Sequence, residues 1–244
     1  MTFDDFSAIF KHSSEFPLEA RDRVPADLWS AIDEGNEAFF DNFAGNQPQA
    51  YKVLTQECGR VHLLEVVSRG LGQGHQNKEH KNYHWGLTCG GRLVICNIPV
   101  SAASVREAMP YLECLPKELW CYYGKMGGMS VPKGPGHGIV DYDLPSNPAG
   151  WREIDYYRKM NNMKKTTLNK INRDFGDHDL RIIVHGTKGD LVLLDFARKD
   201  KKLYHVKDNN FDDYALIENA PQVLDRYFAN AIRGFPEPFD FRRS

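Results

Sequence analysis

The chain has 244 residues, of which 41% are hydrophobic and 26% charged, as in an ordinary globular protein and unlike a disordered one. Lysine and arginine number 31 against 33 aspartates and glutamates, so the formal net charge is -2. That balance lacks the cationic surplus with which proteins bind nucleic acid. No signal-peptide pattern is visible at the start, and no apolar run approaches the ~20 residues of a membrane span. We therefore expect a cytoplasmic protein that binds neither membranes nor nucleic acid.

The first third of the chain predicts a helix followed by two strands. Residues 25–43 begin with a proline and an acidic residue, which suit a first helical turn, and the predicted helix continues through Gly35. Residues 51–55 and 61–67 are rich in β-branched and aromatic side chains and predict strands. The intervening residues 57–60 then form a hairpin turn.

The middle of the chain alternates between short elements and polar loops. Glycines and polar residues over 70–80 predict a surface loop, and residues 92–98 predict a further strand. Glycine and proline are frequent over 124–148, which indicates a long loop or an internal boundary. We accordingly divide the chain into an N-terminal α/β segment, 1–110, which extends the same domain or forms its own, and an α+β domain, 111–244.

Two short sequences in these parts resemble each other. Val24-Pro25-Ala26-Asp27-Leu28-Trp29 and Leu115-Pro116-Lys117-Glu118-Leu119-Trp120 share the positions of proline, an acidic residue and Leu-Trp. Two helices with similar N-terminal chemistry explain the similarity, and an ancient duplication is the alternative.

The last third predicts a helix, a β-meander and a closing helix. Apolar residues recur at helical spacing over 151–175. The β-type runs 180–185, 191–196 and 203–206 are joined by short connections, which link antiparallel neighbours. Residues 219–232 carry an apolar stripe behind an asparagine cap and Pro221, and we expect this helix to dock on the sheet.

Several short sequences in this half resemble the SUKH superfamily, which includes many bacterial immunity proteins. They are Leu115-Pro116-Lys117-Glu118-Leu119 with Tyr122-Tyr123 and Gly127-Gly128, Gly189-Asp190-Leu191-Val192-Leu193-Leu194-Asp195, Leu203-Tyr204-His205-Val206, and residues 216–228. The resemblance implies an α+β fold with a largely antiparallel sheet and flanking helices. It further implies a non-catalytic protein that binds and neutralises a cognate bacterial toxin, encoded by a neighbouring gene and delivered by contact or by a secretion system.

Acidic segments with aromatic neighbours are the candidate binding surface for such a toxin. The residues concerned are Asp141, Tyr142, Asp143, Asp208, Phe211, Asp212 and Asp213, all in predicted loops. Solvated turns explain them, since aspartate and asparagine favour turn geometry. Alternatively they form a negative surface for a basic toxin, with Tyr142 or Phe211 as the desolvated anchor. A calcium site is a third possibility, although the Asp-x-Asp-x-Asp-Gly loop is missing.

The alternative function is a small metal-dependent hydrolase. His75, His80 and His84 precede Cys89, and imidazole and thiolate are good zinc ligands. Their spacings match no zinc motif, and three histidines in a solvated loop need no metal. No nucleophile elbow, phosphate loop or dinucleotide fingerprint is present. We therefore expect no cofactor. The third functional hypothesis is a regulatory protein-binding scaffold.

The five cysteines are Cys58, Cys89, Cys96, Cys114 and Cys121. Their number is odd and their spacings are unpaired, which predicts reduced, buried structural thiols.

Overall fold

The structure is a computed structural model, and thirteen segments of the chain are described. These are residues 10–12, 35–69, 79–97, 113–125, 129–132, 140–143, 152–153, 164–175, 180–185, 190–195, 201–208, 210–234 and 239–242.

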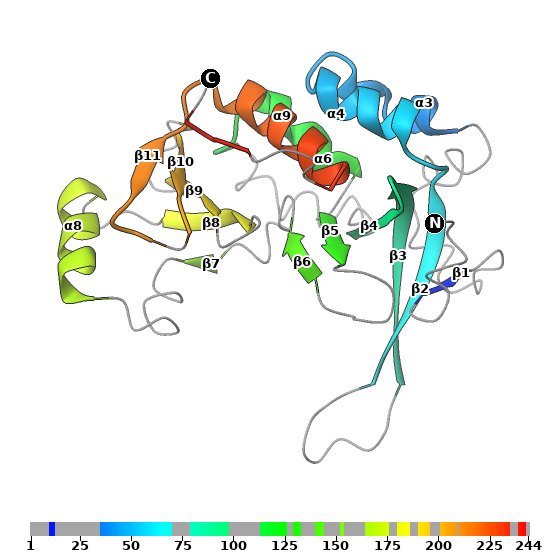
Figure 1. Cartoon of the computed structure of the whole chain (residues 1–244), viewed down its shortest axis with the longest axis horizontal. Coiled ribbons are helices and arrows are strands. Elements are labelled where there is room, and N and C mark those ends of the chain that lie inside the picture. The colour runs from blue at the N-terminus through cyan, green and yellow to red at the C-terminus, as the bar shows by residue number, and fades with distance from the viewer. Residues whose placement is uncertain are drawn as a thin grey trace.

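All strand pairs among these residues are antiparallel, and they follow one another in the order β1-β2-β3-β4-β5-β6-β8-β9-β10-β11, with β7 beside β8 (Figure 1). The predicted α+β fold with an antiparallel sheet is therefore confirmed. The strands are β1 (Phe10–His12), β2 (His62–Arg69), β3 (Glu79–Cys89), β4 (Arg92–Asn97), β5 (Met129–Pro132), β6 (Val140–Asp143), β7 (Arg152–Glu153), β8 (Leu180–His185), β9 (Leu191–Asp195), β10 (Leu203–Val206) and β11 (Tyr214–Leu216).

One row of paired residues crosses the C-terminal half of the sheet. Asp143 in β6 pairs with His185 in β8, and His185 pairs with Leu191 in β9. Leu191 pairs in turn with Val206 in β10, and Val206 with Tyr214 in β11. Adjacent strands lie about 4.8 Å apart, so four steps separate Asp143 from Tyr214 by roughly 19 Å. The end of β6 and the start of β11 thus lie on the same transverse row.

The helices are short, apart from two. They are α3 (Asn36–Phe39), the 3₁₀ turn η2 (Asp41–Phe43), α4 (Pro48–Lys52), the π turn η3 (Val53–Glu57), η4 (Lys117–Leu119), α6 (Trp120–Lys125), α8 (Lys165–Phe175) and α9 (Ala220–Ile232). In Figure 1, α4, α6 and α9 lie along one side of the sheet and α8 lies at its β11 end. Within the described ranges, no helix combines the length and the apolar character that crossing a membrane requires.

A large core joins these helices to the sheet, and it contains residues from both parts of the chain. Trp85 on β3 lies 5.2 Å from the ring of Phe39, measured between centroids. Tyr122 on α6 contacts Phe43 at 5.0 Å and Phe228 on α9 at 4.5 Å. These rings are almost completely buried, and aromatic pairs in edge-to-face arrangements add to the free energy of their burial.

The predicted meander and closing helix agree with the structure except for the helix cap. Strands β8, β9 and β10 form the predicted meander, and the apolar stripe of α9 is buried in the large core. Pro221 lies in the first turn of α9, as predicted. Asn219, however, makes no side-chain cap hydrogen bond, because its φ of 51° places it in the left-handed region. Its backbone carbonyl accepts from Gln222 and Val223 instead.

The predicted strand over residues 51–55 is wrong, since α4 and η3 occupy this segment. Ala50, Val53 and Leu54 are all fully buried, at the three- and four-residue spacing of a helix. Tertiary burial of this stripe overrides the β propensity of valine and threonine. Of the predicted helix over 25–43, residues 25–34 lie outside the described residues. Gly35 has a φ of 100°, and α3 begins directly after it.

The glycine-rich segment 124–148 is not one loop, because β5 and β6 lie within it. The predicted helical stretch 151–175 likewise contains β7 before α8 begins at Lys165. β5 pairs with β4, and both β6 and β7 pair with β8. These partners are distant in sequence, so local composition gave no signal of the three short strands.

Candidate functional site

The turn between β10 and β11 brings three of the predicted aspartates together. Asn210 donates its backbone N–H to Lys207 at 2.7 Å, and Asp213 donates to Asn210 at 2.8 Å. Asp208 has a φ of 52°, a conformation that aspartate and asparagine adopt more readily than most residues. The turn is therefore held by its own backbone, and the aspartates suit its geometry, as the turn interpretation predicts.

Asp212 connects this turn to α8. Its carboxylate accepts a hydrogen bond from the Thr167 hydroxyl at 2.8 Å. The ammonium group of Lys170 donates to the backbone carbonyl of Asp212 and lies 4.6 Å above the ring of Tyr214. Lys170 thus contacts the turn twice, through the carbonyl of Asp212 and through the ring of Tyr214.

Asp213 and Tyr214 each bind a charged side chain from another part of the chain. The guanidinium of Arg242 pairs with the carboxylate of Asp213 and lowers its pKa. The hydroxyl of Tyr214 donates to the carboxylate of Asp174, at the end of α8. Burial raises the pKa of Tyr214, and the hydrogen bond to Asp174 acts in the same direction. The carboxylates of Asp213 and Asp174 are therefore already paired within the chain.

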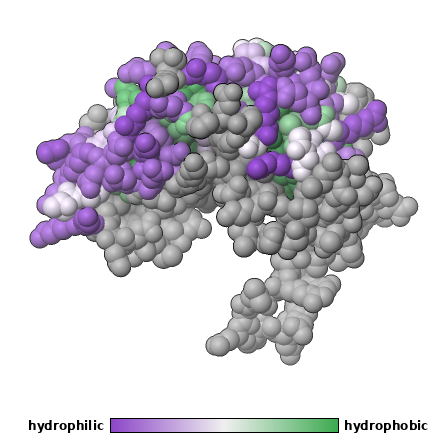
Figure 2. Space-filling model, in the orientation of Figure 1, coloured by the Kyte–Doolittle hydropathy of each residue, from purple (hydrophilic) through white to green (hydrophobic). Residues whose placement is uncertain are grey.

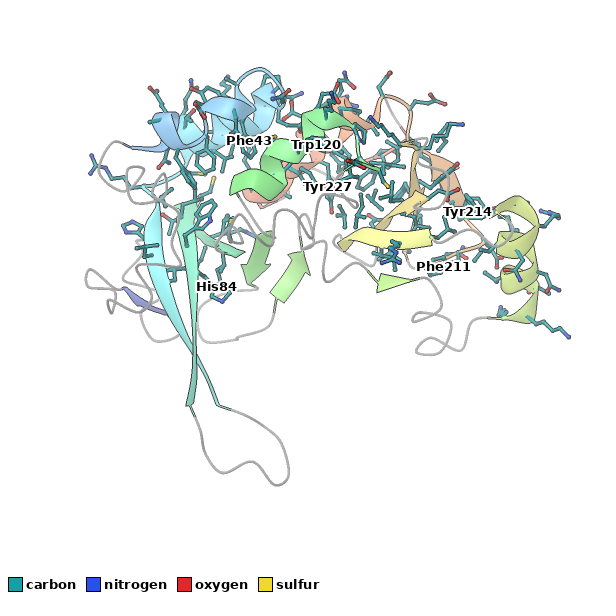
Figure 3. All side chains as sticks on the ribbon, turned by 180° about the vertical axis from the view of Figure 1, so that it is seen from behind. Phe43, His84, Trp120, Phe211, Tyr214 and Tyr227 are labelled. Carbon is teal, nitrogen blue, oxygen red and sulfur yellow. The ribbon has the colours of Figure 1, made fainter. Side chains whose placement is uncertain are left out.

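Phe211, considered with Tyr142 as the desolvated anchor of a binding surface, is buried within the chain. Its side chain is only 4% exposed and belongs to a small core between α8 and the sheet, with Ile171, Phe175 and Leu193. Figure 3 shows Phe211 and Tyr214 between α8 and the strands, well away from Phe43 and Tyr227 in the large core. The hydrophobic residue in the acidic turn thus secures α8 to the sheet.

Asp141, Tyr142 and Asp143 lie in strand β6 and not in the predicted loop. Asp143 pairs with both Ser130 of β5 and His185 of β8. The row of paired residues separates this segment from Tyr214 by roughly 19 Å, so the two acidic segments do not form one compact cluster.

Leu216 is a surface residue that sequence analysis missed. Among the described residues it is the only large hydrophobic side chain that is exposed, at 39%. It ends β11, the last strand in the order, which pairs with β10 on one side. The sequence does carry a weak signal, because Tyr214-Ala215-Leu216-Ile217 is a short β-type run directly after a polar turn.

A half-buried aspartate–histidine pair contacts the acidic turn. Nε2 of His205 lies 3.1 Å from Oδ1 of Asp190, and the same oxygen accepts the backbone N–H of Asp208 at 3.3 Å. The imidazole stacks on Phe241 at 4.3 Å and is 4% exposed. A general base must reach its substrate, and this ring is covered on one face and almost fully buried. Its geometry fits a structural role in fixing the turn.

The histidines considered as zinc ligands are spread along a strand. His80 and His84 both lie in β3, where a separation of four residues corresponds to about 13 Å between their Cα atoms. His75 lies outside the described residues. Within the described part of the chain, no three histidine, cysteine, aspartate or glutamate side chains are grouped as metal ligands would be.

Comparison with known proteins adds no further constraint, because no family model, curated protein sequence or solved structure matches this chain.

Proposed function

We propose that this chain is an immunity-type protein that binds a cationic protein toxin and neutralises it by occupying its active surface, without catalysis. The contact surface in this proposal is the acidic edge, defined by Asp208, Asp212, Asp213, Leu216 and Glu218. The resemblance of the C-terminal half to the SUKH superfamily supports the class of partner, and the geometry of β11 supports the location.

The observation that carries the proposal is the exposure of Leu216 on the last strand of the sheet. An edge strand offers unpaired backbone N–H and C=O groups to an extended segment of a partner. Leu216 is 39% exposed beside those groups, and its removal from water by a partner makes the free energy of binding more favourable. Figure 2 shows largely hydrophilic atoms over α8 and the neighbouring end of the molecule, as is usual at the rim of an interface.

The charges around Leu216 favour a basic partner. Asp208, Asp212 and Glu218 are exposed, and they flank β11 on both sides in sequence. Exposed Lys201, Lys202 and Lys207 offset part of this charge. Lys170 contacts Asp212, and Arg242 is paired with Asp213. Carboxylates in such an arrangement accelerate encounter with a cationic surface and fix its orientation. Toxins that act on nucleic acids carry cationic clefts of this kind.

Co-expression with the product of the adjacent open reading frame tests the function. We expect the two proteins to co-purify, and we expect the chain to protect cells in which that product is toxic. A product that remains equally lethal in the presence of the chain, with no complex on size-exclusion chromatography, would refute the proposal.

Two sets of variants test the surface. Leu216→Asp introduces a charge at the proposed apolar contact, and we expect at least a tenfold increase in Kd. The double variant Asp208→Asn, Glu218→Gln removes two charges while keeping side-chain shape, and we expect a several-fold lower association rate at low salt. Glu37→Gln is the matched control, since Glu37 is exposed on α3 at the other end of the molecule (Figure 1).

A further inference from the structure

Cys58 and Cys89 lie directly opposite each other, although 30 residues (59–88) separate them in sequence. They form an isolated antiparallel bridge next to the hydrogen bond from Gly59 N–H to the Thr88 carbonyl, 2.8 Å long. When the backbone hydrogen bond joins the neighbours of two bridged residues, and not the bridged residues themselves, the bridged residues form a non-hydrogen-bonded pair. The Cα atoms of such a pair lie about 4.5 Å apart, within the range that a disulfide spans.

The backbone holds both cysteines in place. The N–H of Cys58 donates to Val53 at 3.1 Å and ends η3. Cys89 is followed by Gly90 and Gly91, whose φ values of 54° and 78° suit the tight hairpin that returns the chain into β4. Gly59 permits the close approach, because a Cβ atom there would lie 2.9 Å from the Thr88 hydroxyl.

The two thiols interact with each other and with neighbouring charges. A side-chain hydrogen bond between them lowers the pKa of Cys89 and raises that of Cys58. The nearby guanidinium of Arg233 lowers the pKa of both, while Glu57 raises it. Cys58 is partly exposed and Cys89 is 3% exposed, so a small reagent reaches the pair through Cys58. The lowered pKa of Cys89 makes it the thiolate of the singly ionised pair, and the thiol of Cys58 donates the hydrogen bond to it.

We propose that Cys58 and Cys89 are a redox-active dithiol that closes to a disulfide on contact with a peroxide. The Cys89 thiolate attacks one oxygen of hydrogen peroxide, forming an S–O bond as the O–O bond breaks and hydroxide leaves. The sulfur of Cys58 then attacks the sulfenic acid, forming the S–S bond as the S–O bond breaks and water leaves. Two thiols and one hydrogen peroxide thus give one disulfide and two waters.

The bond would join the helical segment to the sheet at a point that also contacts α9. Glu57, next to Cys58, accepts two hydrogen bonds from Arg233, the residue that follows α9. The bond from Nε of Arg233 is 2.7 Å long. A disulfide beside this ion pair fixes η3 against β3 and restricts the unfolded chain across the 30-residue loop. The inference is independent of the proposed function, because the acidic edge contributes none of these residues.

Peptide mapping of the oxidised chain tests the proposal. The purified full-length protein is treated with hydrogen peroxide, its remaining thiols are alkylated, and the peptides are identified by mass spectrometry. We expect a Cys58–Cys89 cross-link that dithiothreitol reverses, and a rise in Tm of about 5 °C or more. Cys58→Ser should abolish both, whereas Cys121→Ser, a substitution at a thiol outside the pair, should retain both.

Three results would overturn the proposal. One is alkylation of both thiols after oxidation. The second is a sulfinic acid on Cys89 while Cys58 stays a free thiol. The third is a disulfide between Cys58 and another cysteine. Since Cys58 is partly exposed, its serine variant is expected to fold, and circular dichroism of that variant checks this directly.

Discussion

Asp225 on α9 accepts a hydrogen bond from the backbone N–H of Ala50 in α4 at 2.8 Å, across 175 residues of sequence. Its second oxygen accepts from the N–H of Gln49 at 3.0 Å. A side chain of the C-terminal helix therefore caps the start of a five-residue helix near the beginning of the described chain. Burial raises the pKa of Asp225, and the two donors partly oppose that shift.

We predict that Asp225→Ala lowers the free energy of unfolding by about 2–3 kcal/mol, because the buried N–H of Ala50 and the partly buried N–H of Gln49 lose their acceptor. Urea unfolding measures the change. Gln222→Ala, at an exposed position of the same helix, should alter stability by less than about 0.5 kcal/mol. Equal effects of the two substitutions would show that the cap contributes nothing specific.

A second prediction concerns the buried hydroxyl of Tyr122, which donates to Oε1 of Gln47 at 3.0 Å. Gln47 is itself fully buried and donates to the Pro221 carbonyl at 3.3 Å. Tyr122→Phe leaves the amide oxygen unsatisfied and should cost about 1–2 kcal/mol of stability. Tyr51→Phe, at a partly exposed tyrosine, is the control and should be nearly neutral in the same unfolding experiment.

The different environments of Phe211 and Leu216 give a third prediction. Phe211→Ala leaves a cavity in the core beneath α8 and should destabilise the protein by about 3–4 kcal/mol. Leu216→Ala removes an exposed side chain and should change stability by less than about 0.5 kcal/mol. Thermal unfolding compares the two. A nearly neutral Phe211→Ala would contradict its burial and restore it as a surface residue.

A fourth prediction follows from the ion pair of Glu57 and Arg233, which lowers the pKa of Glu57 from its ordinary value of 4.5. A carboxyl whose pKa is lower in the folded state stabilises the protein above its unfolded pKa, and this stabilisation is lost as the pH falls through the folded pKa. Both side chains are 36% exposed, so solvent screening limits the effect.

We therefore expect Glu57→Gln to cost less than about 1 kcal/mol at neutral pH. The difference from the wild type should shrink as the pH falls from about 5 to about 3. Urea unfolding across this range measures it. A difference that stays constant with pH would contradict the ion pair as its source.

The parts of the fold that sequence analysis predicted correctly are those whose information is local. The β8–β9–β10 meander follows from short connections between β-type runs, and α9 follows from its apolar stripe. The errors occur where contacts distant in sequence decide the outcome. The clearest example is α4, whose start is capped by Asp225 and whose buried stripe packs under α9.

The candidate site shows the same division. The turn chemistry of Asp208 and Asp212 could be inferred from the local sequence, because these residue types favour turns. The burial of Phe211 depends on α8, and the exposure of Leu216 depends on the position of β11 at the end of the strand order. The bridge between Cys58 and Cys89 likewise exists only once η3 ends opposite β3. No sequence spacing encodes such relationships.

The most direct test of the central claim measures neutralisation of the adjacent gene product by wild-type chain and by the Leu216→Asp and Glu37→Gln variants. The dose required for half-maximal protection is determined for each purified, folded protein. We predict at least a tenfold higher dose for Leu216→Asp and an unchanged dose for Glu37→Gln. Equal protection by all three proteins, or protection by none, would contradict binding through the acidic edge.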